Sequence, residues 1–115
     1  MLIRKYLPKG KYTKVDNRVF LNMNISDGAI RLYGYLASLR TGQNFTDGYV
    51  TKAMQISQRV LTKRKNELKK EGLIMTDRVG AKNYVLYIGY MGMPASKVKE
   101  LWDKIDEGKE EELNG

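Results

Sequence analysis

The stretch FTDGYVTKAMQISQRVLTKRKNELKKEGLI, residues 45–74, decides the fold of this chain. Two hydroxyl residues in it, Thr46 and Ser57, each begin a helical pattern and are suited to cap the first backbone N–H groups of a helix. Ser57 stands only three residues after Met54, where the first pattern ends. Gly72 follows the second pattern at the place where a left-handed residue ends many helices. The stretch therefore predicts two helices joined by a tight turn, the second running to the residue before that glycine.

Two helices with so short a connection form the helix-turn-helix signature, in which the second helix enters the major groove of DNA. Leu61 and Leu68 fall on one side of this helix when each residue advances it by about 100°, so that side is expected to face the core. The opposite side is expected to face a duplex. The candidate DNA contacts of the helix are Ser57, Gln58, Arg59, Thr62, Lys63, Asn66 and Lys70.

The residue types in this set suit a duplex. Arg59 can pair with guanine through two hydrogen bonds, Asn66 can pair with adenine, and Thr62 can touch a base or a phosphate. Lys63 and Lys70 suit phosphate contacts. The alternative is an ordinary solvated helix whose lysines serve solubility.

We favour DNA contact because acids are scarce on the outer side. A solvated helix usually mixes charges of both signs, whereas Glu67 is the only acid near this side. Arg64 and Lys65 fall on the flanks of the buried side. Their stems can cover the core while their charges reach solvent, so they are interpreted as scaffold.

Further elements are expected on both sides of this motif. A short strand is predicted at residues 12–15, followed by a helix that Ser26 caps and Gly42 ends. After the motif, residues 73–77 and 84–88 have the composition of two strands and predict a β-hairpin. The chain order is therefore strand, three helices, hairpin and a last helix.

The hairpin is a candidate wing. Its tip carries Arg78, Lys82 and Asn83, which can lie on the DNA backbone or in the adjacent minor groove. The alternative is a sheet that only closes the core, with a tip charged for solubility. Tyr84 and Tyr87 lie on opposite faces of the second strand, so one is expected inside and one outside. Stacking on single-stranded bases is the less favoured use of these rings.

Both ends of the chain are expected to lie outside the core. Residues 1–11 are basic and are interpreted as an arm or an edge segment, with disorder as the equal alternative. Their candidate DNA contacts are Arg4, Lys5, Lys9 and Lys11. A last amphipathic helix is predicted at residues 93–108, ended by Gly108, and an acidic tail at 109–115. This helix either packs on the body or pairs with the same helix of a second chain in a homodimer, and we favour the pairing. Its apolar residues are Val98, Leu101, Trp102 and Ile105.

Composition excludes several kinds of chemistry. The 115 residues contain no cysteine and no histidine, so disulfides, thiolate nucleophiles and the commonest zinc ligands are excluded. The available carboxylates, Asp16, Asp27, Asp47 and Asp77, sit singly in caps and turns. We therefore expect no enzyme, no metal and no cofactor. Apolar runs are too short for a membrane span or a signal peptide, which favours the cytoplasm.

The distribution of charge favours a polyanionic partner. The net charge is +8, and residues 57–82 hold eight Lys and Arg against three acids. Residues 95–115 hold four Lys against seven acids, so the basic field lies on the body. Such a field suits nucleic acid through counterion release, although it can also serve solubility alone.

The chain resembles the winged helix-turn-helix DNA-binding domains of replication initiators and small operon repressors of Gram-positive bacteria, their phages and their plasmids. The resemblance rests on YTKVDNRVFLNMNISDGAIRLYGYLASL at 12–39, on 45–74 with its S-x-R-x-L and ELKKEGLI segments, and on the hairpin. It implies an α+β fold: a three-helix core and a β-hairpin wing within residues 12–92, with an extra C-terminal helix.

Three residues depart from the pattern of this family. Thr51 stands where the family usually has alanine, Gln55 where it has glycine, and Arg64 where it has a small apolar residue. Glutamine in a left-handed turn costs energy relative to glycine, so the turn before the second helix is expected to be remodelled.

Three functions remain open at this level. The first is a sequence-specific regulator of double-stranded DNA, a repressor of a phage or plasmid operon. The second is a replication or recombination accessory protein that binds an origin. The third is an adaptor or inhibitor that uses the same fold to contact protein, and it predicts no duplex binding at low salt.

Overall fold

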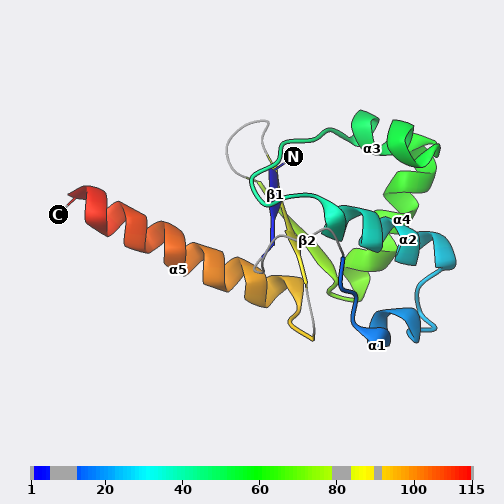
Figure 1. The fold of residues 1–115 in the computed structure, drawn as a ribbon, viewed down its shortest axis with the longest axis horizontal. Coiled ribbons are helices and arrows are strands. Elements are labelled where there is room, and N and C mark those ends of the chain that lie inside the picture. The colour runs from blue at the N-terminus through cyan, green and yellow to red at the C-terminus, as the bar shows by residue number, and fades with distance from the viewer. Residues whose placement is uncertain (1, 6–12, 79–83, 90–91, 115) are drawn as a thin grey trace.

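The computed structural model describes residues 2–5, 13–78, 84–89 and 92–114, with residues 109–114 described by their backbone alone. The fold is α+β, and its described elements are a three-stranded sheet and five helices (Figure 1). The strands are β1 (Leu2–Arg4), β2 (Ile74–Arg78) and β3 (Tyr84–Ile88). The helices are α1 (Asn17–Phe20), α2 (Asp27–Ser38), α3 (Asp47–Met54), α4 (Gln58–Lys70) and α5 (Ala95–Asn114).

The sheet has the order β1-β3-β2. β2 and β3 pair antiparallel, as the predicted hairpin requires, with Ile74 opposite Ile88 and Arg78 opposite Tyr84. β1 pairs with β3 in parallel and lies at the edge of the sheet. Part of the basic N-terminal segment is therefore an edge strand.

The central strand β3 is buried on both faces, and its side chains alternate between two hydrophobic clusters. Leu86 and Ile88 belong to the larger cluster, which the first four helices contribute to. Val85 and Tyr87 belong to a smaller cluster with Ala95 and Val98 of α5. The sheet thus separates the helical body from α5.

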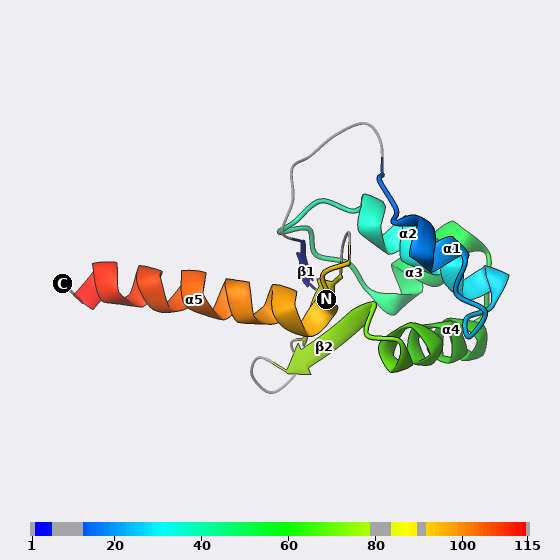
Figure 2. The ribbon, with the colours of Figure 1, turned by 90° about the horizontal axis from the view of Figure 1, so that it is seen from below.

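The shape of the molecule follows from this division. The helices α1 to α4 gather at one end, and α5 extends in the opposite direction (Figures 1 and 2). In Figure 2, α4 and β2 lie along the same side of the molecule. Within the described residues, no helix is both long enough and apolar enough to cross a membrane.

Most helix starts follow the predicted caps. The hydroxyl oxygens of Ser26, Thr46 and Ser57 accept hydrogen bonds from the backbone of the residue three positions later. Gly72 is left-handed with φ 73°, as predicted, one residue after the C-cap of α4. These local hydrogen bonds explain why the boundaries of α3 and α4 could be predicted from single residues.

Other predicted boundaries are wrong. The described part of 12–15 contains no strand, and Asp16 caps the short helix α1 instead. α2 ends at Ser38 without Gly42, whose φ of 88° serves the turn that follows. α5 continues through Gly108 to Asn114, so the predicted helix end at Gly108 is wrong and residues 109–114 belong to the helix. A single glycine lowers helix stability without stopping the helix.

Candidate nucleic-acid interface

The helix α4 is held in place by its apolar side. Leu61 and Leu68 are 1% and 0% exposed, which confirms the predicted inward direction. They join the core cluster that α2 and α3 also line, and α4 packs on both of these helices. The remaining sides of α4 are turned outward, in the position that a groove-binding helix needs.

The turn before α4 is built on Gln55. Its backbone is left-handed, with φ 56° and ψ 48°, and among the described non-glycine residues it is the only one with a positive φ. The N–H groups of Gln55 and Ile56 both donate to the carbonyl oxygen of Thr51, the second at 3.0 Å. The glutamine thus occupies the conformation in which glycine is usual, and the turn is retained.

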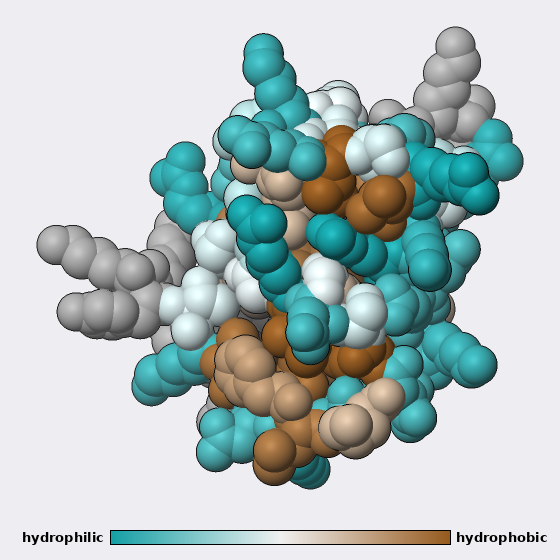
Figure 3. Space-filling model, turned by 90° about the vertical axis from the view of Figure 1, so that its right-hand side faces the viewer, coloured by the Kyte–Doolittle hydropathy of each residue, from teal (hydrophilic) through white to brown (hydrophobic). Residues whose placement is uncertain are grey.

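The outward side of α4 is exposed along its whole length. The predicted contacts, all of which are exposed, are Ser57, Gln58, Arg59, Thr62, Lys63, Asn66 and Lys70. Figure 3 views the helical end of the molecule and shows mostly hydrophilic side chains, with hydrophobic ones gathered toward its lower end and in a smaller group near the top. The lower end is where α1 lies in Figure 1.

The acids of α4 and of its C-cap are occupied by structural partners. The carboxylate of Glu67 accepts hydrogen bonds from the N–H of Ser26 at 3.0 Å and from its hydroxyl at 2.9 Å. Glu71 accepts from the side-chain amide of Asn22 at 3.3 Å. Both negative charges are therefore directed at the residues around the start of α2, where Glu67 also lies favourably at the positive end of the helix dipole.

Asp47, in the first turn of α3, is the third acid near α4. It forms an ion pair of 3.2 Å with Lys65 and accepts from the side-chain amide of Gln58 at 3.1 Å. Gln58 also donates to the hydroxyl of Thr62 at 3.3 Å. Neither contact of Asp47 could be predicted from the sequence, because an acid in the first turn of a helix is expected there for the helix dipole alone. Gln58 and Thr62 are thus exposed, but hydrogen bonds tie the side chain of Gln58 to Asp47 and to Thr62. These two side chains therefore do not extend freely toward a base.

The scaffold role predicted for Arg64 and Lys65 agrees with their half-buried positions. The guanidinium of Arg64 lies directly over Gly28 of α2, where a Cβ atom would overlap it. Its Nη1 is buried and has no hydrogen-bond partner among the described residues. The absence of a side chain at position 28 therefore makes room for Arg64.

The candidate wing is only partly described. Arg78 is exposed at the end of β2, whereas Lys82 and Asn83 lie outside the described residues. Tyr84 is 45% exposed and Tyr87 is 2% exposed, which confirms that the two rings lie on opposite faces of β3. The exposed pair of Arg78 and Tyr84 stands at the end of the hairpin.

The predicted N-terminal arm is corrected where the structure describes it. Arg4 forms an ion pair of 2.9 Å with Asp106, and its guanidinium lies 4.7 Å from the ring centroid of Trp102. Burial alone would lower the pKa of Arg4, but the hydrogen bond and charge of Asp106 outweigh burial and raise it. Lys5 donates to the carbonyl oxygen of Ala37 at 2.7 Å. Arg4 and Lys5 therefore attach the segment to the body.

Lys9 and Lys11, the other two residues of the predicted arm, lie outside the described residues. The charges of residues 1–11 that the structure does describe are thus engaged within the chain.

The apolar residues of α5 lie in two environments: two of them pack inside the chain, and the other two keep exposed surface. Val98 is fully buried, and Trp102 packs against the cluster of Val85 and Tyr87. Both residues therefore pack within the chain, which is the first of the two alternatives for this helix. Leu101 is half-buried and Ile105 is 36% exposed.

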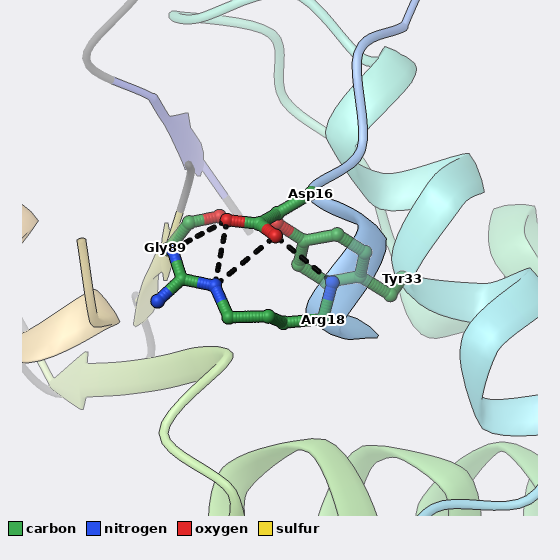
Figure 4. A network of polar contacts seen from close by, with 4 residues as sticks. All are labelled: Asp16, Arg18, Tyr33 and Gly89. Atoms are coloured by element: carbon green, nitrogen blue, oxygen red, sulfur yellow. Dashed lines mark hydrogen bonds and ion pairs between the residues drawn. The ribbon is translucent and has the colours of Figure 1, made fainter. Parts of the chain in front are cut away.

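A polar cluster joins α1, α2 and the end of β3 (Figure 4). The hydroxyl of Tyr33 donates to the carbonyl oxygen of Gly89 at 2.5 Å, which links α2 to the end of β3. Beside it, Arg18 and Asp16 form an ion pair of 2.6 Å, and the hydrogen bonds from Arg18 lower the pKa of the Asp16 carboxyl. This cluster links three elements of the body. Its cation, Arg18, is paired with Asp16 and adds no positive charge to α4.

Among the described residues, no group of three or more acidic side chains is placed to hold a metal ion. The chain was compared with protein-family models, with curated proteins and with solved structures, and none of them matches it.

Proposed function

We propose that this chain is a winged helix-turn-helix protein that binds double-stranded DNA with sequence preference and acts as a regulator of transcription. α4 enters the major groove, and the β2–β3 hairpin lies on the flanking backbone or minor groove. The protein binds without catalysing a reaction, and it works in the cytoplasm.

One observation carries this proposal. The outer side of α4 exposes Arg59, Lys63 and Lys70. The acids on and beside α4 are engaged elsewhere: Glu67 accepts from Ser26, Glu71 accepts from Asn22, and Asp47 pairs with Lys65. The exposed charge along α4 is therefore predominantly positive. A positive helix side of this kind gains binding energy by releasing counterions from phosphates.

The roles of the individual residues follow from their chemistry. Arg59 suits guanine and Asn66 suits adenine, because each can form two hydrogen bonds to the edge of that base. Lys63 and Lys70 suit phosphates, which position the helix without reading sequence. The position of α4 and β2 along one side of the molecule supports simultaneous contact by the helix and the hairpin (Figure 2).

The test is duplex binding measured by fluorescence anisotropy at several salt concentrations. The triple variant Arg59→Ala/Lys63→Ala/Lys70→Ala is compared with the wild type and with Lys14→Ala/Arg40→Ala, which removes two exposed cations outside α4 and α5. Loss of two phosphate contacts should reduce the slope of log affinity against log salt by about 2 in the triple variant only. Equal binding by all three proteins would contradict the proposal.

The position of the natural binding sites separates a repressor from an origin-binding protein. Footprints of the purified protein on its source genome would overlap a promoter in the first case. They would cover iterated repeats at a replication origin in the second.

An adaptor that contacts another protein is the second candidate function. Its support is the apolar group Phe20, Leu21 and Met23, which are 56%, 74% and 94% exposed at the end of α1 and just after it. Exposed apolar side chains in a group are typical of interaction surfaces. This function predicts that the wild type shows no affinity for duplex even at low salt.

A further inference from the structure

The outer half of α5 is a helix without a partner in the described chain. α5 has 20 residues and packs on β3 and β2 through its first half, while its second half extends away from the body in both views (Figures 1 and 2). Among the contacts of described side chains, the one farthest along α5 is the ion pair of Asp106 with Arg4.

Two features of the sequence weaken the outer half of this helix. Gly108 lies inside the helix, where glycine has a low helix propensity. The last ten residues of α5 carry five acids and one Lys, which is unfavourable at the negative end of a helix dipole. A partner with an apolar stripe and positive charge would offset both.

One face of α5 is suited to such a partner. Leu101, Ile105 and Gly108 follow one another at i, i+4 and i+7, the spacing of a helix–helix seam. This face lies beside the one that Val98 and Trp102 use inside the chain, so it stays accessible while α5 is docked. Leu101 is half-buried and Ile105 is 36% exposed, so both retain apolar surface.

The charges along α5 indicate which partner fits this face. The first ten residues of α5 carry three Lys and two acids, a net charge of +1, and the last ten carry one Lys and five acids, a net charge of −4. Two copies of α5 side by side in parallel would bring the acidic halves together. In the antiparallel arrangement, each acidic half lies beside the lysine-bearing half of the other copy. Lys97 and Lys104 are exposed there, Lys97 in an ion pair of 3.2 Å with Glu100 of its own helix.

We propose that the protein is a homodimer in which the α5 helices of two copies pair antiparallel along Leu101, Ile105 and Gly108, centred near Ile105. The pairing is independent of DNA binding. It brings the two bodies to opposite ends of the helix pair, each with its own α4.

The test measures mass in solution without DNA, by light scattering behind a size-exclusion column over a range of concentrations. We expect a dimer for the wild type and a dissociation constant raised at least about tenfold by Ile105→Asp, because this change places a charge in the seam. The matched control is Met23→Asp, the same type of change at an exposed apolar residue at the other end of the molecule, and it should leave the dimer intact. Circular dichroism checks that Ile105→Asp remains folded.

The orientation is tested by disulfide formation, since the chain has no natural cysteine. Positions 97 and 112 continue the same face of α5 to either side of Ile105. A mixture of Lys97→Cys and Glu112→Cys proteins should form the mixed disulfide, and Glu112→Cys alone should not form a disulfide dimer. A monomeric wild type, a dimer that Met23→Asp disrupts, or efficient crosslinking of Glu112→Cys to itself would overturn the proposal.

Discussion

Gln55 is the residue on which the geometry of the turn depends. With φ 56° it holds the left-handed conformation at a steric cost, and its N–H closes the last turn of α3 onto Thr51. Glycine would adopt the same backbone without this cost, but it would lose more conformational entropy on folding.

The two effects on position 55 can be compared in one pair of variants. We expect Gln55→Gly to raise the free energy of unfolding by about 0.5–1 kcal/mol, because relief of the left-handed strain exceeds the entropy cost of glycine. Gln55→Val should lower the free energy of unfolding, because a β-branched side chain fits this conformation worst. Urea denaturation measures both. A destabilised glycine variant would show that the side chain of Gln55 makes a contribution that the backbone argument omits.

The exposed residues of α4 are expected to divide into readers and anchors. Arg59→Ala should cost about 1–3 kcal/mol on a preferred duplex and relax the preference for its base, because a two-bond contact to the base edge is lost. Lys70→Ala should weaken binding to all duplexes alike and reduce the salt slope by about 1. Affinities for a preferred and a scrambled duplex give both quantities. If both variants lose the same affinity on both duplexes, the division of roles is wrong.

At the scale of elements, local signals predicted more than long-range ones. The starts of α2, α3 and α4 were predictable because a single side chain caps each of them within three residues. The parallel pairing of β1 with β3 was not, because it joins residues 2–4 to 85–87 and depends on the burial of Ile3 in the finished core.

In the candidate site, too, only the features set by local spacing could be predicted from the sequence. The outward set on α4 was predictable from helical periodicity. The hydrogen bonds of Glu67 to Ser26, 41 positions away, were not, because no local spacing relates the two residues. The position of Gly28 under Arg64 was likewise hidden, since it depends on how α2 and α4 cross.

Two glycines test how the elements are joined. A Cβ atom at Gly89 would lie 2.7 Å from the carbonyl oxygen of Met93 and 3.1 Å from the N atom of Ala95, where the chain turns from β3 into α5. We expect Gly89→Ala to lower the free energy of unfolding by about 1–3 kcal/mol, because backbone atoms have little room to yield. Gly34→Ala is the control inside α2, where nothing lies within 4 Å of the added atom, and it should raise that free energy by about 0.5–1 kcal/mol. Equal effects at both positions would contradict the close approach at Gly89.

At the scale of the whole molecule, the charges are separated along the long axis. Residues 1–94 carry 17 Lys and Arg against 6 acids, which is the total of 21 and 13 less the 4 and 7 of residues 95–115. If α4 binds DNA as proposed, the basic body faces this polyanion, and the acidic outer half of α5 extends away from the body (Figures 1 and 2). The two proposed interfaces then lie on different parts of the molecule.

The most direct test of DNA contact by α4 is a titration of isotope-labelled protein with a short duplex, followed by amide chemical shifts in NMR spectra. We predict that the largest shifts fall on residues 57–70 and on Arg78 at the end of β2, and that α1 and the outer half of α5 change little. Large shifts confined to α1 or α5, or no shifts at low salt, would contradict this prediction.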